Sequence, residues 1–278
     1  MFWISQSLIK KFYGKYADVE HCPHREYRTT ILGDYENDDS KDKEKGRYFE
    51  TIHLGAGAFG SQEDMTRLRN GNKSADQKRI DELGLLFRKK MAEHNLSIHE
   101  YNTQVHLRMP LKSARYDQQY GFEGHIDIFP TPIFDNGELA LTFADLKLAK
   151  SIYQEFGPYP WGNPFRVDTL QMVGYHTLIR NIDNDFNDVQ NYPPELLDFA
   201  KRGLIRGYYL IFGYGDYTFK LMEVEYDGDK VLDFGERLRK TMSLIDMYTK
   251  QDWPKTPGKV CHKCPVKDCE MQGKTLKL

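Results

Sequence analysis

Two acidic residues and a lysine in the middle of the chain are the first candidates for chemistry. Asp145 and Lys147 stand two positions apart in residues 138–149, an apolar stretch that is typical of a strand. Because side chains alternate across a strand, Asp145 and Lys147 project from the same face. Asp127 comes near the end of a second strand-like stretch, residues 120–129. If these two strands pair, two carboxylates and an ammonium group converge on a small volume.

That combination of charges predicts a metal site for phosphate chemistry. Two neighbouring carboxylates repel each other unless a cation lies between them, which favours a hard divalent ion such as Mg²⁺ or Mn²⁺. A lysine beside the ion can orient or deprotonate a water molecule that attacks a phosphate group. Taken alone, however, an aspartate and a lysine at this spacing are more often part of a solvent-exposed strand edge.

A helix predicted at residues 166–182 follows this strand and carries two further candidates. Gln171 and Tyr175 are four residues apart, which places them on the same helix face. The alternative interpretation is the ordinary packing of an amphipathic helix.

The four cysteines predict a second metal site. They are Cys22, Cys261, Cys264 and Cys269. Disulfides are a poor interpretation in a reducing cytosol, and the simplest fourth ligand to the closely spaced C-terminal three is Cys22. The rival ligands are His21, His24 and His262. Thiolates suit zinc and iron–sulfur clusters equally well. Two features favour an iron–sulfur cluster. Cys22 and Cys264 are each followed by proline, as in ferredoxin-type cluster motifs. The sequence also has no second C-x-x-C pair, which most structural zinc ribbons require.

The residues around these sites alternate between helical and strand-like patterns. Helices are predicted at residues 4–14, 24–33, 76–94, 166–182 and 229–249. Strands are predicted at residues 99–109, 120–129 and 138–149, and as a pair within 208–226 that turns at 213–216. The sequence Asp-Asn-Gly at 135–137 is a hairpin signal. This order indicates an α/β fold with a mixed sheet covered by helices.

Charge and hydropathy along the sequence indicate which partners, nucleic acid or membrane, the protein can contact. The 278 residues carry a formal net charge of -2, so contact with nucleic acid would need a local basic surface. Residues 250–277, with seven lysines, three acids and Trp253, would suit a phosphate backbone and a stacked base. Residues 34–45 hold six acids and three lysines and predict a flexible acidic loop. Without a signal-peptide pattern or an apolar stretch long enough for a bilayer, we expect a cytoplasmic protein with no membrane contact.

The order of these motifs resembles that of the PD-(D/E)XK nuclease superfamily, in particular the CRISPR-associated RecB-like exonucleases and the iron–sulfur AddB-type nucleases. The resemblance is carried by "HLG" at His53, "GHID" at Gly124, "DLK" at Asp145, "QMVGY" at Gln171 and the four cysteines. It implies a restriction-endonuclease-like mixed sheet flanked by helices, in a single nuclease domain over residues 1–278. It also implies that Cys22 and the 261–269 segment tie the termini together around a [4Fe–4S] cluster.

The resemblance further implies roles for individual residues. The implied metal ligands are His53, Asp127 and Asp145. Lys147 would align the attacking water, Gln171 would orient that lysine or the DNA, and Tyr175 would lie near the nucleic-acid backbone. Glu50, three residues before His53, is a further possibility.

The implied function is that of a Mg²⁺- or Mn²⁺-dependent deoxyribonuclease, an exonuclease acting on single-stranded or frayed DNA ends. Its partners would be DNA and protein factors such as a helicase or recombination and adaptation proteins. One alternative is a catalytically silent nucleic-acid-binding subunit of a repair, recombination or CRISPR-adaptation complex. Another is a zinc-stapled interaction protein in which Asp145 and Lys147 are incidental.

Overall fold

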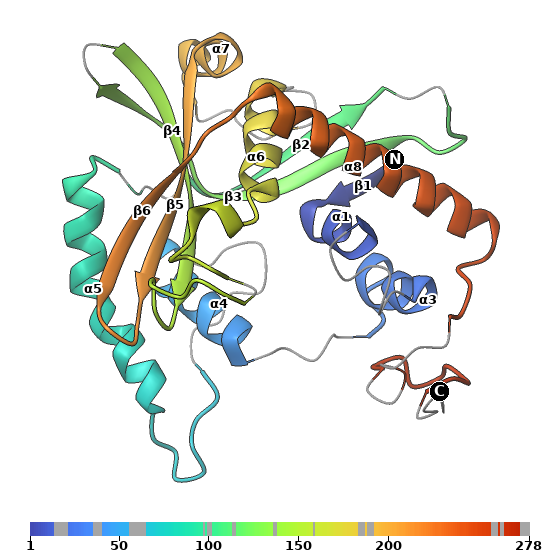
Figure 1. Ribbon diagram of the computed structural model, residues 1–278, viewed down its shortest axis with the longest axis horizontal. Coiled ribbons are helices and arrows are strands. Elements are labelled where there is room, and N and C mark those ends of the chain that lie inside the picture. Colours follow the sequence, from blue (N-terminus) through green and yellow to red (C-terminus); the bar gives the residue numbers. More distant parts are fainter. Residues whose placement is uncertain are drawn as a thin grey trace. The chain divides into compact units, whose positions relative to one another are not determined.

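Figure 1 shows the helices and strands of the chain. The chain, expected as a single nuclease domain, divides into two compact units. The computed structural model describes residues 1–13, 22–35, 41–55, 65–96, 98, 102–112, 115–135, 138–157, 159–182, 187, 192–256, 261 and 264–272, with backbone only at 133–135 and 138. What we call the central unit is formed by Ser40–Met109 and Gly124–Asp227. The terminal unit is formed by Met1–Asp39, Pro110–Glu123 and Gly228–Leu278.

The central unit is built on a mixed sheet. Its strands are β2 (Thr103–Leu111), β3 (Tyr120–Asp135), β4 (Glu138–Ala149), β5 (Leu204–Gly213) and β6 (Thr218–Val224), of which the first residues of β3 and the last of β2 belong to the terminal unit. β3 is antiparallel to β4, β4 is parallel to β5, and β5 is antiparallel to β6, while β2 pairs with β3. The predicted mixed sheet is therefore confirmed.

Helices cover both faces of this sheet. On one face lie α4 (Lys41–Leu54) and α5 (Ala75–Glu93). They form an apolar core with the strands, which includes Phe49, Ile80, Leu83, Phe87, Ala144, Leu146, Leu210 and Phe212. On the other face lies α6 (Leu170–Arg180), where the Tyr175 ring is 6.4 Å from the ring of Phe143. Since strand residues alternate, the odd-numbered positions of β4, which include Asp145 and Lys147, share the face of Phe143.

Gly124 allows α6 to approach β3 closely. A Cβ atom at this position would lie 2.9 Å from the Tyr175 ring and 3.1 Å from Leu178, which is closer than ordinary van der Waals contact. The glycine of the "GHID" motif therefore has a packing reason in this structure.

The terminal unit combines both ends of the chain. β1 (Phe2–Ser5) pairs in parallel with residues Tyr120–Glu123 of β3, and α1 (Gln6–Tyr13) packs against α8 (Gly228–Lys250). Two short elements follow Cys22, namely α3 (Pro23–Glu26) and a π-helical turn at Tyr27–Ile31. The predicted helices at 24–33 and 229–249 are confirmed in outline.

Several predicted boundaries differ from the structure. Residues 2–5 form a strand, so the helix expected at 4–14 begins at Gln6. α4 begins at Lys41, inside the segment expected as a flexible acidic loop; residues 36–40 lie outside the described residues. The reason is tertiary, because Lys45 pairs with Asp76 of α5 at 2.8 Å and bonds to the Tyr214 hydroxyl at 3.0 Å.

Other differences concern elements farther along the chain. β2 begins at Thr103, and residues 99–101 of the strand expected there lie outside the described residues. The helix predicted at 166–182 is shorter, with a 3₁₀ turn at Pro164–Arg166 before α6. α7 (Pro194–Arg202) was not predicted. Residues 136 and 137 of the predicted hairpin turn also lie outside the described residues.

The two longest helices in the described part of the chain carry many charges. α5 has 19 residues and α8 has 23. Among the described residues, no helix combines the length and the apolar character needed to cross a membrane.

Candidate active site

Asp145 and Lys147 of β4 form an ion pair in the central unit. The Lys147 Nζ atom contacts Asp145 Oδ2; the Asp145 side chain is 1% exposed and that of Lys147 is 25% exposed. The acid is thus buried while the lysine reaches toward solvent. Alternation along β4 places the two side chains together, as the sequence predicted.

Asp127 of β3 lies beside this pair. Its Oδ2 atom accepts a hydrogen bond of 2.7 Å from the backbone N–H of Leu146, and its Oδ1 atom accepts one of 3.1 Å from Gln104 Nε2. The strand pairing that the sequence required therefore brings both acids to one place. Gln104 was missed, because a glutamine on a strand carries no signal of its own in the sequence.

α6 contributes an amide to the site. Gln171 Nε2 donates a hydrogen bond of 2.7 Å to Asp145 Oδ1 and one of 2.8 Å to the Tyr175 hydroxyl. The spacing of four along the helix thus has the predicted consequence that both side chains share a face. Tyr209 of β5 lies opposite Asp145 in the sheet register, and Lys147 Nζ is 5.9 Å from the centre of its ring.

The carboxyl groups of the site are buried close to one another, and this shifts pKa values within the site. Burial raises the pKa of Asp127 well above its ordinary value, and the charges of Asp145 and Glu50 raise it further. Burial alone would lower the pKa of Lys147, but Asp145 and Asp127 outweigh burial and raise it. Lys147 is therefore an ammonium ion at neutral pH. The pKa of Tyr175 is also raised, by burial and then by Asp145, so this phenol keeps its proton.

Glu50 of α4 belongs to the same electrostatic cluster. Burial raises its pKa to about 7, with Asp145 adding to the rise and Lys147 opposing it. Glu50 was only a possibility in the sequence, since a charge on an amphipathic helix is usually solvated. The charge of Glu50 in turn raises the pKa of Asp127.

His53, one turn after Glu50, has a different environment. Its ring stacks on Phe87 with centroids 4.3 Å apart and meets Phe49 edge-on at 4.6 Å. Burial lowers its pKa to about 4, and Arg88 lowers it further. Among the described contacts, none joins His53 to Asp127 or Asp145. The structure thus gathers five of the predicted site residues and packs the sixth, His53, between α4 and α5.

The side chains present fit a hard cation in their chemistry. Three carboxylates, those of Glu50, Asp127 and Asp145, act on one another, and one lysine compensates them. Carboxylate oxygens are the ligands that Mg²⁺ and Mn²⁺ prefer. In the described residues, however, no three His, Cys, Asp or Glu side chains converge closely enough to hold a metal ion. In this conformation the Lys147 ammonium group supplies the positive charge beside Asp145.

The segment between β4 and α6 exposes four aromatic side chains among its described residues. We call residues 151–169 the aromatic loop. The exposed rings are Tyr153 at 68%, Phe156 at 65%, Tyr159 at 63% and Phe165 at 100%. This feature was missed at the sequence level, because aromatic residues in a loop are as readily part of a core as of a surface.

The aromatic loop is anchored next to the charged cluster. Trp161 is buried, its ring is 5.4 Å from that of Tyr209, and its carbonyl oxygen accepts a hydrogen bond of 2.5 Å from Lys220. The Tyr159 ring lies nearly parallel to that of Trp161 at 6.4 Å. A series of rings therefore leads from Tyr209, beside Lys147, to the exposed part of the loop.

The four cysteines all belong to the terminal unit, and no disulfide joins any of them. Cys22 precedes α3, and a turn joins Cys264 N–H to the Cys261 carbonyl oxygen at 3.3 Å. Burial raises the pKa of the Cys264 thiol, and the charges of Cys22 and Cys269 raise it further. Within the part of the chain described, they do not form a ready metal site, and the cluster stays a prediction. The rival ligands His21 and His262 lie outside the described residues.

Trp253 does not have the role expected of it. Its side chain is 6% exposed and stacks on Tyr27 with ring centroids 4.8 Å apart. The expectation that Trp253 stacks on a base is wrong, because the ring is used to pack α8's end against the segment after Cys22. Of the nearby lysines, Lys250 pairs with Asp246, Lys255 pairs with Glu270 and Lys267 is exposed, while residues 259, 263, 274 and 277 lie outside the described residues.

Comparisons with known proteins bear on the fold. No family model matches the chain, and no curated protein matches it either. Among solved structures, it is similar to a candidate exonuclease from Eubacterium rectale, with a TM-score of 0.57 and 14% identity over 99% of this chain and 90% of that one. A second similar structure, SSO0001, has a TM-score of 0.39 and 12% identity over 97% of this chain and 86% of that one. The first likeness shows that the α/β fold, a mixed sheet flanked by helices, is shared with that protein.

Proposed function

We propose that the protein is a metal-dependent nuclease of the PD-(D/E)XK type that hydrolyses phosphodiester bonds in DNA. The observation that carries the proposal is the buried cluster of Asp127, Asp145 and Lys147, with Gln171 donating to Asp145 at 2.7 Å. Strongly shifted pKa values at a cluster of opposite charges are typical of catalytic sites. The fold shared with the candidate exonuclease from Eubacterium rectale adds support.

The proposed mechanism assigns a task to each side chain. Asp127 and Asp145 would hold Mg²⁺ or Mn²⁺, which when bound polarises the scissile phosphate and lowers the pKa of its water. Lys147, held as an ammonium ion by the neighbouring carboxylates, orients the attacking water and balances charge on the phosphate. Gln171 fixes the orientation of the Asp145 carboxylate.

The structure supports Glu50 more strongly than His53 as a further residue of the proposed active site. Glu50, with a pKa of about 7, can accept the proton that the attacking water loses. His53 was expected as a third metal ligand from the family resemblance, but its ring packs against Phe49 and Phe87. Glu50 is therefore the better supported residue of α4.

The aromatic loop supports single-stranded or frayed DNA as the substrate. Aromatic rings bind unpaired bases by stacking, whereas bases inside a duplex are already stacked on one another. The loop joins β4, which carries Asp145 and Lys147, to α6, which carries Gln171. Bases held by Tyr159 or Phe165 would thus lie on the segment that connects the two elements carrying Asp145, Lys147 and Gln171.

The test is hydrolysis of end-labelled single- and double-stranded DNA with Mg²⁺, Mn²⁺ or EDTA. Wild type and the control variant Lys78→Ala, which changes an exposed lysine of α5, should cleave single strands only when metal is present. Lys147→Ala should lose activity by roughly 100-fold or more. The position of the label then reports the direction of digestion. Equal activity of wild type and Lys147→Ala would overturn the assignment.

A catalytically silent nucleic-acid-binding subunit is the second candidate function. One observation favours it: Lys147 compensates Asp145 directly, and within the described residues no three ligands converge for a metal ion. Wild type that binds DNA but is inert with every metal would select this function. Its partner would then be a helicase or a recombination or adaptation factor.

We also propose that Cys22, Cys261, Cys264 and Cys269 hold a [4Fe–4S] cluster with a structural role. The raised pKa of the Cys264 thiol, to which Cys22 and Cys269 contribute after burial, supports this, and bound metal would add folding free energy to the terminal unit. Iron, acid-labile sulfide and zinc should be measured in anaerobically purified wild type and Cys264→Ser. We expect iron and sulfide in wild type and their loss in Cys264→Ser. Zinc without iron would overturn the cluster in favour of a zinc staple.

A further inference from the structure

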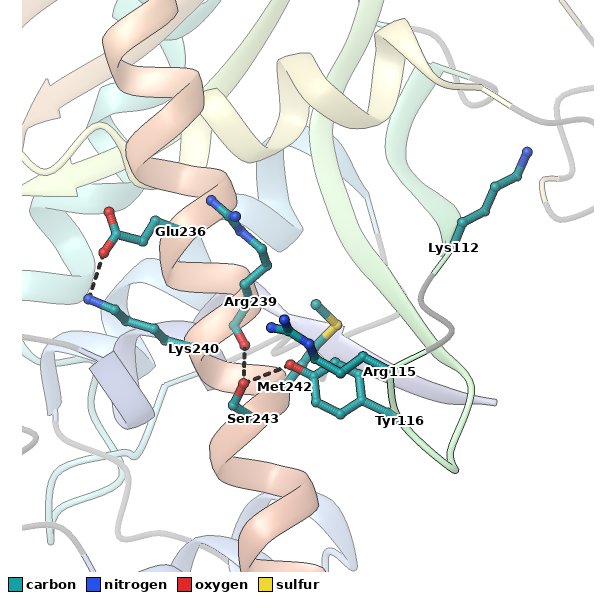
Figure 2. Close-up of a pocket in the computed structure, with 8 residues that line it drawn as sticks. All are labelled: Lys112, Arg115, Tyr116, Glu236, Arg239, Lys240, Met242 and Ser243. Atoms are coloured by element: carbon teal, nitrogen blue, oxygen red, sulfur yellow. Dashed lines mark hydrogen bonds and ion pairs between the residues drawn. The ribbon is translucent and has the colours of Figure 1, made fainter.

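A basic pocket lies in the terminal unit, between α8 and the segment that precedes β3. It has a volume of about 570 Å³ and is lined by Lys112, Arg115, Tyr116, Glu236, Arg239, Lys240, Met242 and Ser243 (Figure 2). Five of these residues belong to α8, and four of them, at positions 236, 239, 240 and 243, recur at helical spacing on one face. A volume of this size is typical of sites for ligands as large as a nucleotide.

The lining is strongly cationic. Four of its eight residues are lysine or arginine, and one is acidic. The acid, Glu236, is engaged by Lys240 at 2.7 Å, a bond that also lowers the pKa of the glutamate. Arg239 Nε donates a hydrogen bond of 3.1 Å to the backbone oxygen of Gly235. The pocket therefore keeps an excess of positive charge that its own acid does not neutralise.

The floor of the pocket is fixed by packing. Tyr116 and Ser243 share a hydrogen bond of 2.7 Å between their hydroxyl groups, and Ser243 also donates to the Arg239 carbonyl oxygen at 3.1 Å. The Tyr116 ring meets the buried Tyr120 edge-on at 5.5 Å. Figure 2 shows the Arg115 guanidinium group beside this ring, whereas the Arg239 side chain extends along α8 away from it. These hydrogen bonds and ring contacts fix the surface from which the two cations extend.

We infer that this pocket binds the phosphodiester backbone of a single nucleic-acid strand. Guanidinium groups match phosphate oxygens with paired N–H donors, and exposed cations bind a strand without regard to its sequence by releasing its counterions. The cations come from two separate elements, the segment before β3 and α8, so they can contact successive phosphates. A lone phosphate ion would engage only part of this surface. The inference rests on the proposed function, because it says how the substrate of that enzyme is held.

The pocket is a basic surface that the sequence did not predict. Of the C-terminal lysines that the structure describes, Lys250 and Lys255 are paired with acids and Lys267 is exposed, while Trp253 is buried. In the described residues, four cations gather where Lys112 and Arg115 meet α8.

The test measures binding of a fluorescent single-stranded DNA of about 20 nucleotides, in EDTA so that no cleavage occurs. Anisotropy titrations at salt concentrations from about 50 to 200 mM give both the affinity and its salt dependence. The test variant is Arg115→Ala/Arg239→Ala. The control is Arg79→Ala/Arg202→Ala, which removes the same charge from exposed positions of α5 and α7.

The double variant of the pocket should bind about tenfold more weakly at about 100 mM salt, and its logarithmic salt slope should be shallower by about 1.4, the value for two lost phosphate contacts on a single strand. The control should match wild type in both quantities. Lysine replacements, Arg115→Lys/Arg239→Lys, should restore most of the slope because the charge is kept.

Equal affinities and slopes for the pocket variant and the control would overturn the inference. So would inorganic phosphate that binds wild type as tightly as DNA does, because the pocket would then serve a small anion. Failure of the proposed function is a separate result. If wild type binds DNA through Arg115 and Arg239 but never cleaves it, the inferred binding site is supported and the proposed nuclease activity is refuted.

Discussion

The Asp127 carboxylate accepts a hydrogen bond of 2.7 Å from the backbone N–H of Leu146, the residue between Asp145 and Lys147. This bond ties one acid to the strand that carries the other acid and the lysine. Because the donor is a backbone group, Asp127 is held in place although burial, Asp145 and Glu50 all disfavour its charge. The cluster therefore carries an electrostatic cost that a bound cation would relieve.

Replacing Asp127 by asparagine should stabilise the fold and abolish activity. The amide oxygen can still accept the Leu146 hydrogen bond, while the repulsion with Asp145 and Glu50 is removed. In EDTA, we expect a rise in Tm of roughly 2–4 °C, which corresponds to about 1 kcal/mol for a chain of this size. Calorimetry and the cleavage assay check the two effects, and an Asp127→Asn protein that is less stable than wild type would contradict the argument.

Glu50 and His53 should respond differently to substitution. Glu50→Gln removes a carboxylate that raises the pKa of Asp127, so cleavage should fall by roughly 10- to 100-fold and the metal concentration for half-maximal activity should rise. His53→Phe places a third ring against Phe49 and Phe87, so activity and Tm should be retained. Metal titrations of both variants make the comparison. A large loss of metal affinity in His53→Phe would show that His53 leaves its present packing to act as a ligand.

Removing rings from the aromatic loop should weaken binding of single strands. Tyr159→Ala/Phe165→Ala deletes two exposed aromatic side chains, and each stacked base contributes about 1–3 kcal/mol. We expect the Kd for single-stranded DNA to rise by roughly tenfold or more, with a smaller effect on blunt duplex DNA. The matched control is Leu85→Ala/Leu232→Ala, which removes exposed apolar side chains elsewhere. Equal losses for both substrates would speak against base stacking.

His176 should make the protein less stable in mild acid. Burial lowers its pKa to about 3, and Arg180 lowers it further, while its ring stacks on Tyr226 at 3.3 Å. Since the folded pKa lies below the unfolded value of 6.5, protons bind first to the unfolded chain. The contribution of neutral His176 is thus complete above pH 6.5 and is lost progressively as the pH falls toward 3.

Urea unfolding at pH 7 and pH 5 tests this prediction. Between these values, wild type should lose about 2 kcal/mol more than His176→Gln, which cannot take up the proton. Identical pH dependence of wild type and variant would mean that His176 has an ordinary pKa in the folded protein.

The strands and the long helices could be predicted because local patterns specify them. The alternation of β4 and the spacing of Ile80, Leu83 and Phe87 on α5 follow from one face being buried, and both elements have nearly the predicted bounds. α4 could not be predicted from its charged start, since Lys45 is held there by Asp76 and Tyr214. These partners are distant in sequence.

The candidate site shows the same division. The sequence by itself determined which side chains share a face, because strand and helix periods place Asp145 with Lys147 and Gln171 with Tyr175. Only the tertiary structure decided that Gln171 donates to Asp145, that Glu50 joins the cluster, and that His53 and Trp253 are packing residues. The reason is physical: periodicity sets the direction of a side chain, whereas burial and the charges around it depend on segments that meet only when the chain has folded.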